Sequence, residues 1–243
     1  MPNKQKHRGA HPEDAKLFTP AHIAELRQAI EHLSYLLSRD YPFAASIKLV
    51  GDRFRFSERQ RQALQHSVSS RQAVELRRKT QLPLNELAGK QVIIDGYNQL
   101  IPIECALSGA PLFIGLDGCY RDIASIHSTY RKVEETLPAI ELIGSTLQQF
   151  GVEKTVWVLD SPVSNSGRLK MMLLEVAAQK GWNWDVLLEH NPDKYITQHD
   201  MVALSSDSWV LDRAKSWVNF TAYIIDTYIK DAWIMDLQGS AIS

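Results

Sequence analysis

Three aspartates that follow apolar, strand-like segments could together do metal chemistry. Asp95, Asp160 and Asp207 each come directly after, or within three residues of, such a segment. Apolar runs without polar alternation are typical of strands buried on both faces, and open α/β sheets bind ligands at the carboxyl ends of their strands. Clustered carboxylates repel one another unless a cation neutralises them, so the pattern predicts a Mg²⁺ or Mn²⁺ site.

Further polar residues extend this candidate site. Asp212 lies one helical turn and a residue beyond Asp207 and is a candidate fourth metal ligand. Asn98 and Ser206 stand beside the first and third aspartates, where they could contact a phosphate oxygen. An aspartate at a strand end can instead cap the helix that follows, and this alternative stays open for each position.

Two loops are candidate substrate contacts. The segment 161–168 follows Asp160 and opens a helix, so its backbone amides with Asn165 and Arg168 could hold an anion. An ordinary capped turn explains it as well. Between Asn98 and residue 136 we expect a glycine-containing loop beside the acidic edge. In this loop Arg121 and Arg131 could hold phosphates, and Tyr130 could stack on a base. Asp122 and Glu104 are reserve metal ligands. His127 is a further candidate, although a single histidine is more often structural.

Composition limits the function classes. The chain has 243 residues, a formal net charge of −1 and 44% hydrophobic residues, enough for one large or two small globular domains. Cys105 and Cys119 lack the spacing of a metal site, and no apolar stretch reaches the roughly 20 residues that span a bilayer. The polar amino terminus does not resemble a signal peptide, so we expect a cytoplasmic protein. The oligomeric state stays open, a homodimer included.

A local basic region lies within this near-neutral chain. Eight of the residues between 53 and 79 are arginine or lysine, opposed only by Glu58 and Glu75. Arginine suits phosphate recognition through its planar fork of donors, although helices are commonly Arg-rich on their solvated side.

The first 82 residues predict a helical module. Thr19-Pro20 is a typical helix start, and apolar residues recur at helical spacing to residue 37. Residues 44–50 predict a short second helix closed by Gly51, and Ser57 to Gln60 has the form of a capping box that opens a third.

Residues 83–243 predict an α/β domain. Strands are expected at 91–95, 155–160, 184–188 and 201–204, and helices at 136–150, 167–180 and 207–215. This alternation favours a parallel sheet with helical crossovers. Residues 220–235 are apolar but ambiguous between strand and helix.

These residues also carry a resemblance. The strand ends DGYN, VLDSP and SSDS resemble those of PIN-like nucleases, especially the NYN branch. The stretches RGAHPEDAKLF, LAGKQVIIDGYN and SGAPLFIGLDGCYRD are similar to an uncharacterised bacterial and archaeal family of unknown function. That family joins a helical amino-terminal module to a PIN-like domain, so the resemblance implies a three-layer α/β fold with a central, mostly parallel sheet.

The resemblance implies metal-dependent hydrolysis of RNA phosphodiester bonds. It places Asp95, Asp160 and Asp207 at the positions of catalytic metal ligands and Asn98 at that of the asparagine following the first acid. One departure is Trp209, which stands where the superfamily often has a further acid. The alternative is therefore a non-catalytic RNA- or nucleotide-binding protein on the same fold.

Overall fold

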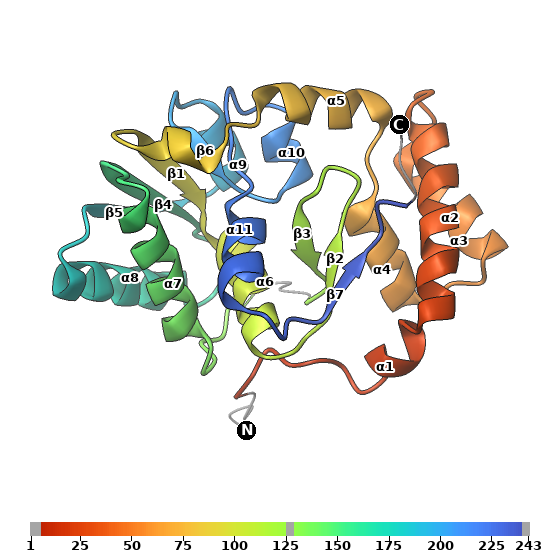
Figure 1. The fold of residues 1–243 in the computed structure, drawn as a ribbon, viewed down its shortest axis with the longest axis horizontal. Helices are drawn as coiled ribbons and strands as arrows, with labels where there is room; N and C mark the ends of the chain where they lie inside the picture. Colours follow the sequence, from red (N-terminus) through yellow and green to blue (C-terminus); the bar gives the residue numbers. More distant parts are fainter. Residues whose placement is uncertain (1–5, 125–128, 240–243) are drawn as a thin grey trace.

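The computed structural model describes residues 6–124 and 129–239, and Figure 1 gives their arrangement. Residues 6–80 form a helical region that wraps one side and the top of an α/β body (Figure 1). Its helices α1 to α5 span Asp14–Leu17, Pro20–Leu37, Phe43–Arg53, Glu58–Ser67 and Arg71–Thr80.

Local signals explain where these helices begin. The Thr19 side chain accepts a hydrogen bond from the His22 amide at the start of α2, and the predicted capping box of Ser57 and Gln60 starts α4. Both predicted helices are confirmed. Gly51, expected to close α3, lies inside it, and a Cβ built there would collide with Arg61 Nη1, so glycine leaves room for that guanidinium.

The central sheet has four parallel strands in the order β5-β4-β1-β6. β1, β4, β5 and β6 span Gln91–Asp95, Lys154–Asp160, Trp184–Glu189 and Val202–Leu204. Each predicted strand is confirmed to within two residues. The α/β class with a mostly parallel sheet and a preceding helical part is therefore correct.

Helices cover the sheet on both faces. One face packs on α6 (Gly96–Leu107), α7 (Thr136–Gln149), α8 (Ser166–Lys180) and α11 (Phe220–Tyr228). The opposite face packs on the shorter helices α9 (Pro192–Thr197) and α10 (Ser208–Leu211). The predicted helix 207–215 ends early because the chain must turn to bring Trp217 beside Gln81 and Ala203.

The segment expected to form a loop after Asn98 is largely regular structure, and that expectation was wrong. It contains α6 and the antiparallel strands β2 (Leu112–Ile114) and β3 (Tyr120–Asp122). The ambiguous carboxyl-terminal stretch divides into α11 and β7 (Ile234–Asp236), which pairs in parallel with β2. These three strands make a second sheet in the order β3-β2-β7. His127 lies outside the described residues.

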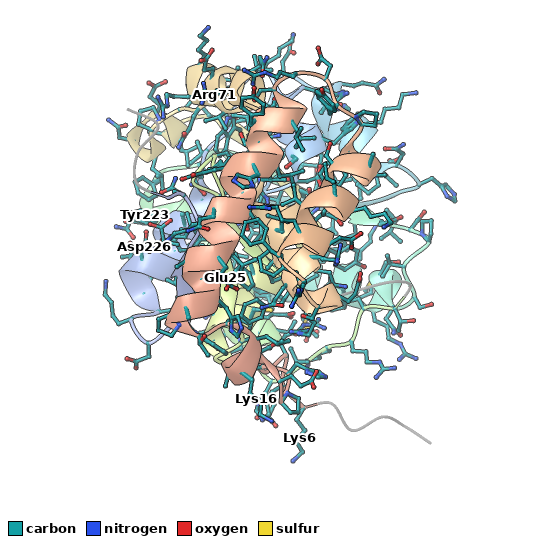
Figure 2. The ribbon with its side chains drawn as sticks, turned by 90° about the vertical axis from the view of Figure 1, so that its right-hand side faces the viewer. Lys6, Lys16, Glu25, Arg71, Tyr223 and Asp226 are labelled. Atoms are coloured by element: carbon teal, nitrogen blue, oxygen red, sulfur yellow. The ribbon has the colours of Figure 1, made fainter. Side chains whose placement is uncertain are left out.

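The second sheet joins the helical region to the central sheet. Leu112 of β2 packs into the core around the central sheet, whereas Phe113 faces the helices and meets Phe18 edge-on at 4.9 Å. Phe113 thus belongs to a second apolar cluster, on the side of the helices, which also contains Leu26, Ile30, Leu33, Leu64, Ile123, Met235 and Leu237. Figure 2 shows α2, marked by Glu25, along the outer surface, with Arg71 near one of its ends and Lys16 beyond the other.

The structure shows the state of the two cysteines and the apolarity of the helices. Cys105 and Cys119 are both buried free thiols. Within residues 6–124 and 129–239, no helix combines the length and apolarity that crossing a membrane requires.

The turn from β1 to α6 leaves no room for a side chain at Gly96. A Cβ there would lie 3.0 Å from the Val158 carbonyl oxygen and collide with the Leu159 side chain. We expect Gly96→Ala to lower the free energy of unfolding by about 1–3 kcal/mol, measured by urea denaturation. Gly167→Ala is the matched control, since nothing lies within 4 Å of a Cβ there, and an equal loss in both variants would contradict this packing.

Candidate functional site

Side chains that share one face of the central sheet converge at its carboxyl edge. Side chains alternate along a strand, so Asp95 points to the same face as Ile93, and Asp160 to the same face as Val158. That face packs on α9 and α10. Asp95 is in register with Val158, which places Asp160 two residues further along the neighbouring strand.

Asp95 is the most deeply buried of the predicted metal ligands, at 4% exposure. Its Oδ2 accepts hydrogen bonds from Ser205 Oγ at 2.7 Å and from Asn98 Nδ2 at 2.9 Å. Burial raises the pKa of Asp95 to about 7; the Ser205 and Asn98 hydrogen bonds oppose the shift, while the charges of Asp207 and Asp193 increase it. The carboxylate is thus oriented by neutral donors, with no cation to neutralise it among the described residues.

Asp160 presents an unpartnered oxygen to the same region. Its Oδ1 is buried and has no hydrogen-bond partner among the described residues. Burial raises the pKa of Asp160, and only the charge of His190 opposes that shift. A buried carboxylate oxygen without a donor is costly in protein interiors, which makes it a position for a ligand.

Asp193 is a further acid, which the strand-end pattern did not predict. It lies in the first turn of α9, half-buried, and its pKa is raised by burial first and then by the charges of Asp207 and Asp160. The signal was the sequence Asn191-Pro192-Asp193, a typical helix start that directly follows the strand β5. Because Asp193 lies in a helix and not at the end of a strand, the strand-end pattern does not predict it.

Asp207 and Asp212 are both engaged by the protein. Asp207 caps α10, accepting hydrogen bonds through Oδ1 from the amides of Trp209 at 2.7 Å and Val210 at 3.1 Å. The Oδ1 of Asp212 accepts a 2.8 Å hydrogen bond from Arg77 Nε. The capping alternative therefore describes Asp207 correctly, although its charge still acts on the pKa values of Asp95 and Asp193.

Two buried arginines fix the segment that carries Asp207. Arg121 donates through Nε to the Ser206 carbonyl at 2.6 Å and through both terminal nitrogens to Asp117. Arg77 donates to Asp117 at 2.5 Å and to the Ser208 carbonyl at 3.3 Å. Arg121 was expected to bind substrate phosphate, but these contacts commit its guanidinium to holding the protein together. The two arginines hold the pKa of Asp117 down at about 2 against the effect of burial.

The other predicted substrate contacts are dispersed. Asn98 and Ser206 line a cavity beside the acids, and Ser206 Oγ donates to the Asn98 carbonyl at 3.1 Å. Asn165 has a left-handed φ of 71°, and its side-chain amide donates a hydrogen bond to the Tyr130 carbonyl. Arg168 is exposed. Neither residue lines this cavity or the smaller cavity that holds Asp95 and Asp193.

The reserve residues of the segment after Asn98 also differ in their surroundings. Glu104 is fully buried and accepts hydrogen bonds from Arg8, Tyr130 and Thr136, so this group ties the amino-terminal segment to α6 and α7. Tyr130 is accordingly a core residue and is not available for base stacking. Asp122 does line the cavity, and burial raises its pKa to about 6.

Two adjoining cavities run along the acidic edge. A larger one of about 670 Å³ includes Asp160 and Asp207, and a smaller one of about 260 Å³ includes Asp95, Asp160 and Asp193. Tyr97, Asn98 and Asp160 line both, so the two cavities adjoin, and together we call them the acidic cleft.

His66 of α4 is a second residue that the sequence analysis did not single out. It lines the larger cavity, exposed to solvent, from the helical side. Although His66 keeps contact with solvent, the protein packed around its ring and the charge of Arg121 lower its pKa, against the raising effects of the Asp122 backbone and the Asp207 charge.

The carboxylates of the acidic cleft could hold a Mg²⁺ or Mn²⁺ ion only together with water or substrate ligands. Among the described residues, no three His, Cys, Asp or Glu side chains form a ready-made metal cage. Mg²⁺, however, is usually held by one or two carboxylates, with waters and substrate phosphates completing its coordination. The unpartnered Asp160 oxygen and Asp95, both at the 260 Å³ cavity, fit that second description.

Comparison with known proteins places the chain in a family. Residues 84–223, more than half of the chain, match the family described as Domain of unknown function (DUF5616), and the chain belongs to it. Residues 25–80 match a second model, Protein of unknown function (DUF434).

A curated relative spans both regions. The chain is 26% identical to Uncharacterized protein MJ0935 of Methanocaldococcus jannaschii over 207 residues, which cover 84% of this chain and 98% of that protein. No solved structure matches the chain.

The Asp117 ion pairs should be essential for stability. Asp117→Asn leaves two buried guanidinium groups without their shared counter-ion, and breaking such a buried pair costs about 3–5 kcal/mol. We expect that loss in urea denaturation. Asp52→Asn, which removes a solvent-exposed partner of Lys48 and Arg61, should leave the denaturation midpoint nearly unchanged. Similar midpoints for the two variants would show that Asp117 is dispensable.

The buried Asp95 should make stability depend on pH. Its folded-state pKa of about 7 lies above the ordinary value of 3.8, so ionisation costs stability fully above pH 7 and not at all below pH 4. Asp95→Asn should therefore raise the free energy of unfolding at pH 8 by roughly 2–4 kcal/mol, and the gain should vanish toward pH 4. Denaturation in EDTA at both pH values measures this; a gain that does not change with pH would contradict the assignment.

Proposed function

We propose that this protein is a divalent-metal-dependent hydrolase of RNA phosphodiester bonds, and that residues 83–243 form a PIN-like domain of the NYN type. The observation that carries the proposal is the set of acids at the carboxyl edge of the sheet. Asp95, Asp160 and Asp193 all have raised pKa values, and no described basic side chain forms an ion pair with any of them. Titratable groups perturbed in this way concentrate at functional sites.

The arrangement divides the work among these residues. Asp95 and Asp160 would hold a Mg²⁺ or Mn²⁺ ion, with Ser205 and Asn98 orienting Asp95 through hydrogen bonds at 2.7 and 2.9 Å. When bound, such an ion supplies Lewis acidity to a phosphoryl oxygen and to the attacking water. Asp193, whose carboxylate has a raised proton affinity, would accept a proton from that water.

The shape of the cleft supports a polymer substrate. The larger cavity is lined both by the acids and by the helical region, and it adjoins the smaller one at Tyr97, Asn98 and Asp160. A chain of nucleotides can pass along such a cleft while one phosphate occupies the acidic edge. The second candidate function is non-catalytic binding of RNA or a nucleotide, and the engagement of Asp207 and Asp212 by α10 and Arg77 favours it.

Cleavage assays distinguish the two functions. Purified protein with Mn²⁺ should shorten single-stranded RNA, and EDTA should stop the reaction. Asp95→Asn and Asp160→Asn should abolish cleavage, and Asp193→Asn should slow it by about 10²- to 10⁴-fold through loss of the proton acceptor. Asp200→Asn, an exposed carboxylate whose partner is Lys215, is the control and should retain full activity.

Two results would overturn the catalytic proposal. If RNA binds tightly but survives Mn²⁺, Mg²⁺ and Co²⁺, the non-catalytic function holds. If cleavage persists equally in Asp95→Asn and Asp160→Asn, it arises elsewhere or from a contaminant. A Mn²⁺ titration by calorimetry gives an independent measure, because only the variants that keep both carboxylates should bind the ion.

A further inference from the structure

The acidic cleft has a second wall that the acids do not explain. Besides Asp160 and Asp207, residues of the helical region line the larger cavity, namely Phe43 of α3 and Gln65 and His66 of α4. We call these three residues the helical wall. Its chemistry differs from that of the sheet edge, because it combines an aromatic ring with neutral polar side chains.

All three residues line the cavity and are exposed to solvent. Phe43 retains 40% exposure, unusual for a phenylalanine, and Gln65 and His66 are also exposed. No hydrogen bond joins the Gln65 side-chain amide to another residue in the described ranges 6–124 and 129–239. Both its donor and its acceptor therefore remain free for a ligand.

Hydrogen bonds of Arg77 connect the two walls. Arg77 of α5 lines the cavity between them, joined to Ser69 Oγ at 2.8 Å on the helical side and to the Ser208 carbonyl at 3.3 Å on the sheet side. The cavity is therefore a preformed feature of the fold, and its volume of about 670 Å³ is in the range of small-ligand sites.

We propose that the helical wall is a nucleobase-binding subsite for single-stranded RNA, in which Phe43 stacks on one base while Gln65 and His66 hydrogen-bond its edge. This inference rests on the proposed function, since the phosphate beside that base would occupy the acidic edge. Unpaired bases are recognised in this way, by stacking on aromatic rings and by hydrogen bonds to their edges. A base-paired strand cannot use the subsite, because its base edges are engaged and its faces are stacked.

The polarity of the cleft supports a nucleotide over a peptide. One end carries the acids that, under the proposed function, hold a metal ion and through it a phosphate, and the other offers a ring face with neutral donors and acceptors. A nucleotide has this same division between its phosphate and its base. A cationic peptide would compete with a metal ion for the acids, whereas a nucleotide phosphate would need that ion.

Binding measurements in a non-cleaving background test the subsite. With Asp95→Asn as parent, a fluorescent single-stranded RNA of six nucleotides should bind about tenfold more weakly when Phe43→Ala is added, the effect of losing one stacked base. Phe43→Tyr should restore binding. Leu49→Ala is the matched control, since Leu49 is on the same helix, is 64% exposed and does not line the cavity. The same sequence annealed to its complement should bind equally to all four proteins.

The outcomes separate the subsite from the proposed function. In the cleaving protein, Phe43→Ala should raise KM about tenfold and leave kcat within twofold. If Phe43→Ala and Leu49→Ala have the same effect on binding while the protein cleaves RNA, the subsite is wrong and the proposed function stands. If the parent binds no RNA and the wild type cleaves none, the proposed function fails and the subsite with it. Binding of a peptide in place of RNA would also overturn the subsite.

Discussion

A single buried carboxylate, that of Asp117, organises the structure around the candidate site. It accepts hydrogen bonds from Arg77 on α5 and from Arg121 on β3, and those arginines in turn hold the backbone carbonyls on either side of Asp207. Two cations need two anions, and Asp212 supplies the second through Arg77. Because this group is neutral as a whole, it can be buried, and it sets the position of the helical region against the central sheet.

The acids at the sheet edge lack that compensation. Asp95 and Asp160 lie a short distance from the Asp117 group, yet the protein gives them hydroxyl and amide donors or none at all. The Asp117 group is neutral as a whole, whereas the charges of Asp95 and Asp160 are not compensated by an ion pair among the described residues. These uncompensated charges lower the stability of the folded protein. Such local exceptions to otherwise consistent design are characteristic of binding and catalytic sites.

The sequence predicted the parts of this structure that depend on local patterns. The apolar runs ending at Asp95 and Asp160 and the caps at Thr19 and Ser57 identified strands and helices within a few residues. It did not predict the second sheet, because three-residue strands carry little periodicity and β7 pairs with a partner more than a hundred residues earlier. The roles of Arg121 and Asp193 were likewise hidden, since both depend on which distant segments meet in the fold.

The strand β7 has a consequence for how the chain folds during synthesis. Met235 and Leu237 complete the apolar cluster of the amino-terminal helices, and Arg27 Nε donates to the Asp236 carbonyl, 209 residues away. Contacts between residues so far apart in the chain form slowly and only after residues 234–237 have been synthesised. Until β7 pairs with β2, Phe113 and Ile123 cover the inner faces of α2 and α4 only in part, and the remaining apolar surface favours aggregation.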